Sequence, residues 1–120
     1  MKSLLPLSCL LLAATLSIGG RQGYDNGWLP LKNLDDEHVR AIALFAVTEQ
    51  NRNSPGPILM MENVGSGETQ WVYGDAGVVY RLVLVAYFVG LESYSEDFEV
   101  TVWDKGCDNF QLMSFSRLQD

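Results

Sequence analysis

The stretch "VVYRLVLVAYFVG" (residues 78–90) decides how the rest of the chain is interpreted. Its β-branched and aromatic residues are typical of a β-strand, and it is the strongest strand prediction in the sequence. We therefore expect a β-sheet at the centre of the fold. The neighbouring segments are interpreted by whether they can pair with this strand.

The segment before this stretch predicts one long partner strand. Residues 58–64 and 68–73 are both strand-like, and they flank the short run "GSG". Gly65 and Gly67 permit a β-bulge, so the two pieces are expected to form a single strand that bends at the glycines. The run "GDAG" that follows predicts a turn, and hence an antiparallel hairpin with residues 78–90.

The segments after this stretch predict two more strands. "FEVTVW" (residues 98–103) alternates between two faces, and "FQLMSFSRL" (residues 110–118) is expected to be the last strand. "DKGCDN" (residues 104–109) predicts a second hairpin turn between them. One face of the first of these strands carries Phe98, Val100 and Val102, and the other carries Glu99, Thr101 and Trp103.

A helical pattern precedes the strands, in "DDEHVRAIALFAVTEQN" (residues 35–51). Asp35 can cap the start of this helix, and Pro55 and Pro57 prevent it from continuing. One largely apolar face is predicted from residues at helical spacing, which are Val39, Ile42, Ala43, Ala46, Val47 and Gln50. One helix followed by consecutive strands predicts an α+β fold, in which one long α-helix packs across a four- to five-stranded antiparallel sheet.

Residues 1–20, "MKSLLPLSCLLLAATLSIGG", have the build of a secretory signal peptide. Lys2 precedes a short apolar run, and small residues close the segment. We therefore expect one folded domain in residues 21–120 and delivery to the secretory pathway, to an extracellular or vacuolar site. In the alternative, the segment is an apolar helix of the domain. The run is too short for a comfortable membrane span, so no membrane association is expected.

The composition excludes some partners and some chemistry. A formal net charge of −7 over 120 residues argues against nucleic acid, because a phosphate backbone attracts a basic surface. His38 is the only histidine and is expected to be a solvated residue of the first helical turn, so no metal site and no cofactor are expected. No enzyme is expected either, and a cysteine hydrolase built from Cys107 and His38 is the alternative in that class.

Cys107 is also a candidate for contact between chains. Removal of residues 1–20 would remove Cys9 and leave Cys107 as the one cysteine of the mature chain. We therefore expect that two mature chains can be joined by a disulfide through Cys107. Exchange of the hairpin formed by residues 58–70 and 78–90 between two chains is a separate route to a dimer.

The two hairpin turns predict a binding surface. Two predicted turns, residues 70–77 and 104–109, follow strands that run in the same direction in a meander. Both turns therefore project from the same end of the sheet. The lead-in to the helix, with Gly27, is expected to end nearby. Together the three segments form a wedge whose apolar tips suit a cleft on another protein. In the alternative, Trp71 and Tyr73 pack back onto the sheet as an aromatic cluster.

Three motifs, in this order, give the chain a resemblance to the plant cystatins, which inhibit papain-like cysteine proteases. "GW-P" (residues 27–30) is similar to the glycine-containing start of that family. "IALFAVTEQN" (residues 42–51) resembles the helix signature of the plant branch, and "QWVYG" (residues 70–74) fits the Q-x-V-x-G loop. The match covers nearly all of residues 27–118.

The resemblance implies a cystatin-like fold and a reversible inhibitor of papain-like cysteine proteases. In the family, the Q-x-V-x-G loop enters the cleft beside the catalytic cysteine. The start of the domain lies along the non-primed side of the cleft, and the second hairpin packs on the primed side. The residues that the resemblance assigns to protease binding are Gly27, Gln70, Trp71, Val72, Tyr73, Gly74, Gly106 and Cys107.

The second hairpin departs from the family pattern. Where the family usually carries Pro-Trp, this chain has Gly106 and Cys107. An aromatic anchor is absent, and loss of an interface Trp commonly costs about 2–4 kcal/mol of binding free energy. The alternative functions are therefore a cystatin-fold binding module whose protease inhibition is weakened or lost, and an unrelated secreted α+β protein.

Overall fold

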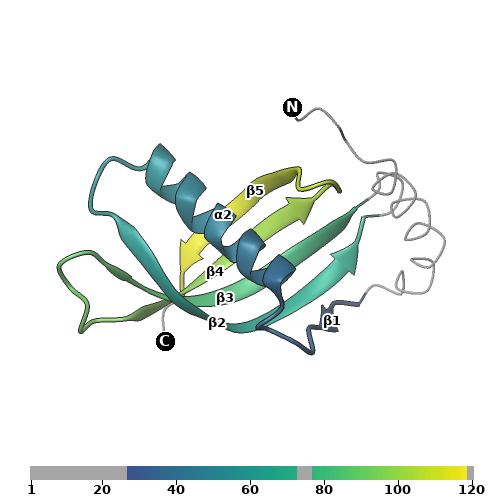
Figure 1. Ribbon diagram of the computed structural model, residues 1–120, viewed down its shortest axis with the longest axis horizontal. Coiled ribbons are helices and arrows are strands. Elements are labelled where there is room, and N and C mark those ends of the chain that lie inside the picture. The colour runs from purple at the N-terminus through teal and green to yellow at the C-terminus, as the bar shows by residue number, and fades with distance from the viewer. Residues whose placement is uncertain (1–26, 73–76, 119–120) are drawn as a thin grey trace.

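The computed structural model describes residues 27–72 and 77–118, which form one helix and one sheet (Figure 1). The helix, α2, spans Glu37–Asn53. The strands are β1 (Leu29–Pro30), β2 (Leu59–Trp71), β3 (Val78–Phe88), β4 (Glu96–Asp104) and β5 (Phe110–Arg117). The predicted signal peptide, residues 1–20, lies outside the described residues.

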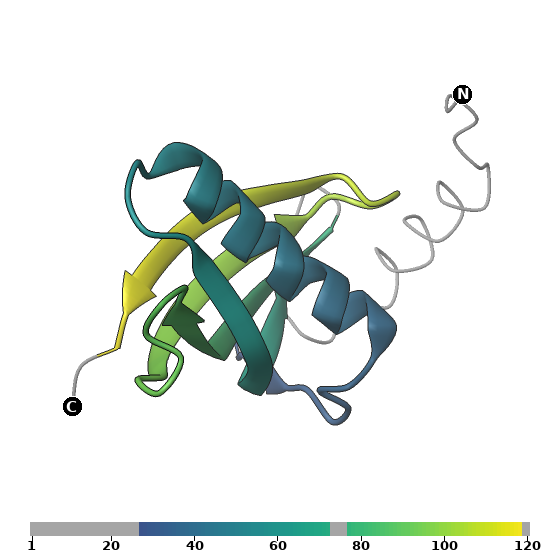
Figure 2. The same cartoon turned by 60° about the vertical axis from the view of Figure 1, so that its left-hand side comes forward.

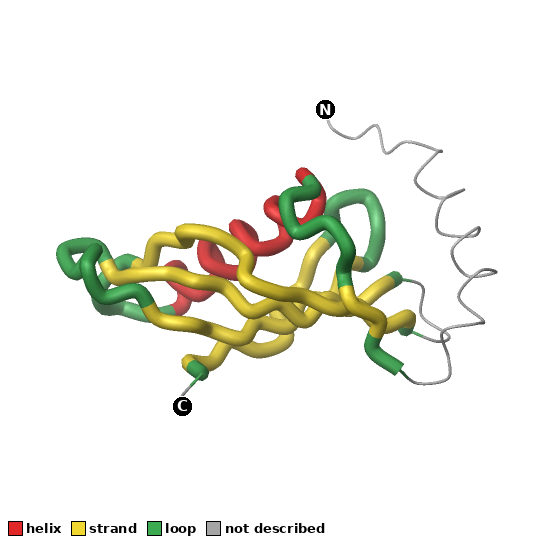
Figure 3. The backbone as a smooth tube through the Cα atoms, turned by 90° about the horizontal axis from the view of Figure 1, so that it is seen from below, coloured by secondary structure: helices red, strands yellow, loops and turns green. Residues whose placement is uncertain are grey.

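The sheet is an antiparallel meander whose strands follow one another in chain order, from β1 at one edge to β5 at the other. The helix lies across one face of the sheet and contacts β2, β4 and β5. Figures 2 and 3 show this arrangement from two further directions. The predicted α+β fold, one long helix packed across an antiparallel sheet, is therefore confirmed, with five strands.

The glycines of β2 have two different roles. β2 is one strand, as predicted, and its register against β3 shifts twice; the second shift places Gly65 at a bulge. Gly67 pairs in register with Leu82, so the prediction of a bend at that glycine is wrong. A Cβ on Gly67 would lie 2.7 Å from Leu82 Cδ2 and 2.8 Å from Leu31 Cδ1. Gly67 therefore allows Leu31, which follows β1, to pack closely against β3.

The N-terminus of α2 is capped by Asp36, one position after the predicted cap, Asp35. The Asp36 side chain accepts a hydrogen bond from the backbone N–H of His38 at 3.1 Å. This bond satisfies one of the N–H groups that the start of a helix leaves without an intrahelical partner. The cap therefore fixes the first turn, and with it the position of His38.

The C-terminus of α2 is tied to the start of β2 by Asn51. Its side-chain oxygen accepts a hydrogen bond from Leu59 N at 2.9 Å, and its side-chain nitrogen donates one to Leu59 O at 3.0 Å. The helix ends at Asn53, because Ser54 precedes Pro55 and proline disfavours a helical backbone in the residue before it. The two bonds of Asn51 therefore set the turn from the helix into the sheet.

The core lies between α2 and the residues of the strands that face it. Alternation along β4 buries Phe98, Val100 and Val102, which confirms the predicted core face of that strand. The whole buried set is Val39, Ile42, Ala43, Ala46, Val47, Leu59, Leu82, Leu84, Ala86, Phe98, Val100 and Val102. It includes every residue predicted for the helix face that packs on the sheet except Gln50, which is only half-buried. Among the described residues, no helix is long and apolar enough to cross a membrane.

Candidate functional site

Two hairpin tips follow the ends of β2 and β4, and both of these strand ends lie at the right in Figure 1. The first tip, residues 72–77, connects β2 to β3, and the second tip, residues 105–109, connects β4 to β5. Val78, just after the first tip, pairs with Asp104, just before the second. The prediction that both turns project from the same end of the sheet is therefore confirmed. We call this part of the molecule the hairpin end.

The lead-in segment reaches the hairpin end as well. β1 pairs with the last part of β2, which brings Gly27 and Trp28 close to the first tip. The guanidinium of Arg81, on β3, lies 4.1 Å from the centroid of the Trp28 ring. The same guanidinium donates two hydrogen bonds to Glu68 Oε2, from Nε at 3.1 Å and from Nη2 at 2.7 Å. The lead-in is thus fastened to β2 and β3 by a stacked and paired arginine.

Three of the predicted binding residues lie where β2 meets the first tip. Gln70 and Trp71 end β2, Val72 follows, and all three side chains are half-buried. The backbone N–H of Val72 donates a hydrogen bond to Gly77 O at 3.2 Å, which closes the base of the tip. The other predicted binding residues of this tip, Tyr73 and Gly74, lie outside the described residues.

The two tips contact each other at their bases. Gly77 has a φ of 120°, and a Cβ there would lie 2.5 Å from Asp104 O and 2.8 Å from Trp103 Nε1. Only glycine therefore fits at this position, both for its backbone conformation and for the space. Lys105 Nζ lies 4.7 Å from the centroid of the Trp103 ring. Trp103, near the end of β4, thus lies close to one residue of each tip, Gly77 and Lys105.

The second tip has a strained backbone. Gly106, Cys107 and Asp108 have φ values of 101°, 56° and 61°. A residue other than glycine in this left-handed region commonly costs about 1–3 kcal/mol, and such strain persists only where the surrounding structure enforces it. Backbone hydrogen bonds at 2.9 and 3.0 Å join Lys105 N to Asn109 O and Asn109 N to Gly106 O.

The backbone of the second tip bears on the difference from the family's Pro-Trp pair at Gly106 and Cys107. Proline holds φ near −65°, so it cannot adopt the φ of 101° found at Gly106. The second tip therefore differs from a Pro-Trp hairpin in its backbone as well as in its side chains. Cys107 is disulfide-bonded in the structure. A disulfide through Cys107 between two mature chains stays a prediction.

His38 reaches the base of the second tip, so it is a half-exposed residue with tertiary contacts, whereas a solvated residue of the first turn was predicted. Its Nε2 lies 2.7 Å from Asp104 Oδ2, and its side chain is 41% exposed. Its ring makes edge-to-face contacts with the rings of Tyr80 and Phe110. The other oxygen of Asp104, Oδ1, accepts a hydrogen bond from Gly106 N at 2.9 Å. The sequence carries no local signal for this contact, because 66 positions separate the two residues.

Tyr80 has the one clearly shifted pKa among the described residues. Its pKa is raised from 10.0 to about 12, first by burial and then by the negative charges of Asp104 and Asp36. Both effects disfavour the phenolate, because it would be a further negative charge in a poorly solvated place. The hydroxyl of Tyr80 therefore stays neutral over the whole physiological range of pH.

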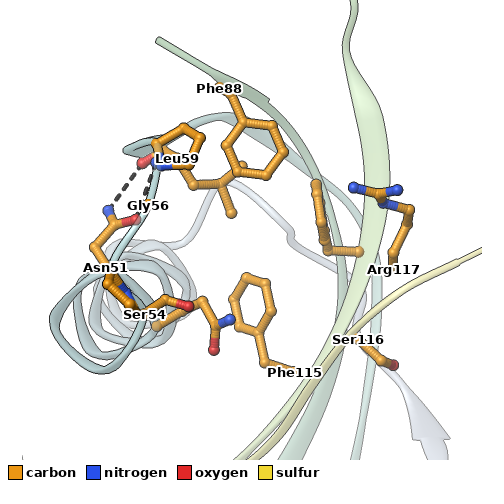
Figure 4. Close-up of a pocket in the computed structure, with 12 residues that line it drawn as sticks. Asn51, Ser54, Gly56, Leu59, Phe88, Phe115, Ser116 and Arg117 are labelled. Atoms are coloured by element: carbon orange, nitrogen blue, oxygen red, sulfur yellow. Dashed lines mark hydrogen bonds between the residues drawn. The ribbon is translucent and has the colours of Figure 1, made fainter.

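An open pocket of about 480 Å³ lies at the opposite end of the sheet (Figure 4). Phe88 and Phe115 line it, and two of its polar side chains are already engaged. Asn51 binds the backbone of β2, and the Nε of Arg117 lies 2.7 Å from Glu96 Oε1. Within residues 27–72 and 77–118, no group of three or more His, Cys, Asp or Glu side chains could hold a metal ion. We therefore place the candidate site at the hairpin end.

Comparison with known proteins identifies several similar sequences. Residues 31–118 match a family model described as "Aspartic acid proteinase inhibitor". The chain is 39% identical over 113 residues to "Cysteine proteinase inhibitor 5" of Arabidopsis thaliana, a match that covers 93% of this chain and 85% of the relative. It is 36% identical over 103 residues to "Cysteine proteinase inhibitor 1" of Actinidia chinensis var. chinensis, which covers 84% and 83%.

A rice relative matches a shorter part of the chain. "Cysteine proteinase inhibitor 6" of Oryza sativa subsp. japonica is 40% identical over 77 residues, which is 64% of this chain. The match spans 63% of the length of that relative. The names therefore divide between two classes of target, since the three relatives are named for cysteine proteinases and the family model for aspartic ones.

Proposed function

This chain belongs to the family of plant cysteine proteinase inhibitors, the phytocystatins, and we propose that it blocks the active-site cleft of papain-like cysteine proteases with its hairpin end. It is an inhibitor of cysteine proteases and not an enzyme. In the proposed mechanism no bond is cut. The inhibitor occupies the cleft reversibly and excludes the substrate.

The observation that carries this proposal is the alignment of the two tips. The pairing of Val78 with Asp104 makes them leave the sheet together, and the contact of Gly77 with Trp103 keeps their bases in register. Because the bases of the two loops are held side by side, we expect them to enter one cleft at a lower entropy cost than two loops that are held independently. A single exposed loop would lack this advantage.

Each of the three segments supplies a different contact. Where β2 meets the first tip, Trp71 and Val72 offer apolar side chains to the cleft. Gln70 offers a side-chain amide that can form hydrogen bonds. Gly27 allows the lead-in to approach another backbone closely, as the non-primed side of a cleft requires. The second tip offers Gly106 and Cys107 to the primed side. Because these two replace Pro-Trp, we expect weaker inhibition than the family pattern would give.

Two other functions remain as candidates for the test. Inhibition of an aspartic proteinase is favoured by the description of the matching family model. A cystatin-fold binding module with weakened or lost inhibition is favoured by the positive φ of Gly106, which excludes the usual proline. We rank papain-like enzymes first, because three relatives that span 64–93% of the chain are named as cysteine proteinase inhibitors.

We also propose that residues 1–20 are a signal peptide and that the mature inhibitor, residues 21–120, acts outside the cell or in the vacuole. The support is the order of charge, short apolar run and small residues in that segment. N-terminal sequencing of the secreted protein tests this directly. A mature chain that begins near residue 21 is expected, and one that still begins at Met1 would contradict it.

A panel of proteases tests the choice of target. Papain and pepsin are each titrated with the purified protein, and the hydrolysis of a small fluorogenic peptide is followed. Reversible, stoichiometric loss of papain activity with no effect on pepsin is the expected result. Inhibition of pepsin alone would show that the target is an aspartic proteinase. A folded circular dichroism spectrum with no inhibition of either enzyme at micromolar protein would select the binding module.

A further inference from the structure

We propose that His38 and Asp104 are a positioning pair, which holds the second tip in the conformation that enters the protease cleft. This inference rests on the function proposed above. Neither residue is among those that the resemblance assigns to protease binding, although Asp104 is the first residue of the second predicted turn, residues 104–109. Their role is exercised through the tip, by fixing its base to the start of the helix.

The carboxylate of Asp104 connects the helix to the tip because its two oxygens have different partners. Oδ1 accepts the hydrogen bond of Gly106 N at 2.9 Å, inside the second tip. Oδ2 lies 2.7 Å from Nε2 of His38, on α2. The side chain of Asp104 is 12% exposed and that of His38 is 41% exposed, so both bonds of the carboxylate are partly buried. Hydrogen bonds to an ionised carboxylate in such a place are stronger than those between neutral groups.

The imidazole of His38 is itself held in place from several directions. The backbone N–H of His38 is bonded to the cap residue Asp36, which fixes the first turn of the helix. The ring packs edge-to-face against Tyr80 on β3 and Phe110 on β5. The groups with titratable side chains around it are thus Asp36, Tyr80 and Asp104. A ring fixed by the helix and two strands can in turn fix the carboxylate that it meets.

The second tip needs such support because its backbone is strained and its sequence is flexible. Gly106, Cys107 and Asp108 all have positive φ, and two of them are not glycine. Gly106 replaces the rigid proline of the family pattern and does not itself restrict the backbone. Contacts with residues outside the tip are therefore needed to hold its conformation. The bond from Asp104 to Gly106 N does this at the first of the three residues. Pre-organisation of this kind improves affinity by reducing what must be ordered on binding.

Removal of the imidazole should therefore weaken inhibition without unfolding the chain. We expect His38→Ala to weaken inhibition of papain roughly tenfold, the size of effect expected when a charged group loses one hydrogen-bond partner. The change should appear as faster dissociation rather than slower association. His38→Gln keeps an N–H donor at a similar reach and should recover most of the loss. Asp104→Asn can accept only one of the two hydrogen bonds well, so it should resemble His38→Ala.

The test compares inhibition constants and dissociation rates for papain across a set of full-length variants. The set contains the wild type, His38→Ala, His38→Gln, Asp104→Asn and the double variant of His38→Ala with Asp104→Asn. Arg40→Ala, an exposed change on the same helix, is the matched control. Amide hydrogen exchange at Gly106 and Asn109 is measured by NMR in the same proteins. A purely structural role would not produce selective exchange in the tip with rescue by glutamine.

The expected result has three parts. The double variant inhibits no worse than either single variant, exchange at the tip amides rises at least severalfold, and Arg40→Ala behaves as the wild type. Equal inhibition by the wild type and His38→Ala, or unchanged exchange in the tip, overturns this inference alone. A wild type that does not inhibit papain overturns the proposed function, and this inference with it. If His38→Ala does not fold, Asp104→Asn decides by the same criteria, with His38→Gln as the variant that should stay close to the wild type.

Discussion

The guanidinium of Arg81 lies 4.1 Å from the centroid of the Trp28 ring and is paired with Glu68 at 2.7 Å. This arrangement joins the lead-in to two neighbouring strands, β2 and β3. It explains how a segment with only two residues of β-structure, Leu29–Pro30, is held beside the first tip. The position of Gly27 in the proposed wedge therefore depends on Arg81 and Glu68, which lie outside the three family motifs.

The stacking of Trp28 on Arg81 predicts a defect in binding rather than in folding. Trp28→Ala should weaken inhibition of papain roughly tenfold, because a cation–π contact and the packing of the lead-in are lost. Trp28→Phe keeps an aromatic face and should lose much less. Inhibition constants measured for both variants test this. Equal inhibition by Trp28→Ala and the wild type would show that the position of the lead-in does not matter.

The first tip should be the most sensitive part of the surface. Val72→Asp places a charge on a side chain that is proposed to be desolvated in the cleft, and inhibition should weaken by roughly 100-fold or more. The thermal midpoint should change little, because Val72 follows the end of β2. Ile58→Asp is the matched control, since Ile58 is 47% exposed and lies just before the far end of β2. If both variants lose inhibition equally, the tip is not the contact surface.

The conformation of Gly106 predicts that the family's proline cannot simply be restored. Gly106→Pro would force φ from 101° towards −65°. It would also remove the backbone N–H that donates a hydrogen bond to Asp104 Oδ1. The free energy of unfolding should fall by more than about 1 kcal/mol. Urea denaturation measures this, with Gly56→Ala as the control, because nothing lies within 4 Å of a Cβ at Gly56. An equally stable Gly106→Pro variant would mean that the tip has a different backbone.

The raised pKa of Tyr80 predicts a loss of stability at high pH. The folded chain binds the phenolic proton more tightly, with a pKa of about 12 against an ordinary 10.0. The contribution is therefore fully present below pH 10 and is lost as the pH rises towards 12. Tyr80→Phe should lack this part of the pH dependence. Unfolding measured between pH 9 and pH 12 compares the two proteins, and identical profiles would contradict the assigned burial.

Much of the fold followed from local patterns in the sequence. The alternation of residues 98–103 placed Phe98, Val100 and Val102 in the core, and the helical spacing of the apolar residues gave the buried face of α2. The order of strands and turns gave the meander. These features depend on side-chain periodicity over a few residues, so they are readable without tertiary information.

The details of the hairpin end did not follow, because they depend on distant residues. The sequence around His38 predicts a solvated helix residue, because its partner Asp104 lies 66 positions away along the chain. Arg81 belongs to a strand whose pattern says nothing about Trp28. Gly67 was assigned to a bend, whereas its role is to admit Leu31. Each of these contacts is set by how separate elements meet, which periodicity does not encode.

The central claim is that the hairpin end occupies the protease cleft in place of the substrate. Steady-state kinetics of papain with a small fluorogenic peptide, at several concentrations of the inhibitor, tests this most directly. We predict that the apparent KM rises linearly with inhibitor concentration from its uninhibited value while kcat stays unchanged, and that the inhibitor is recovered intact. A fall in kcat at constant KM would show that the chain binds away from the cleft and would contradict the claim.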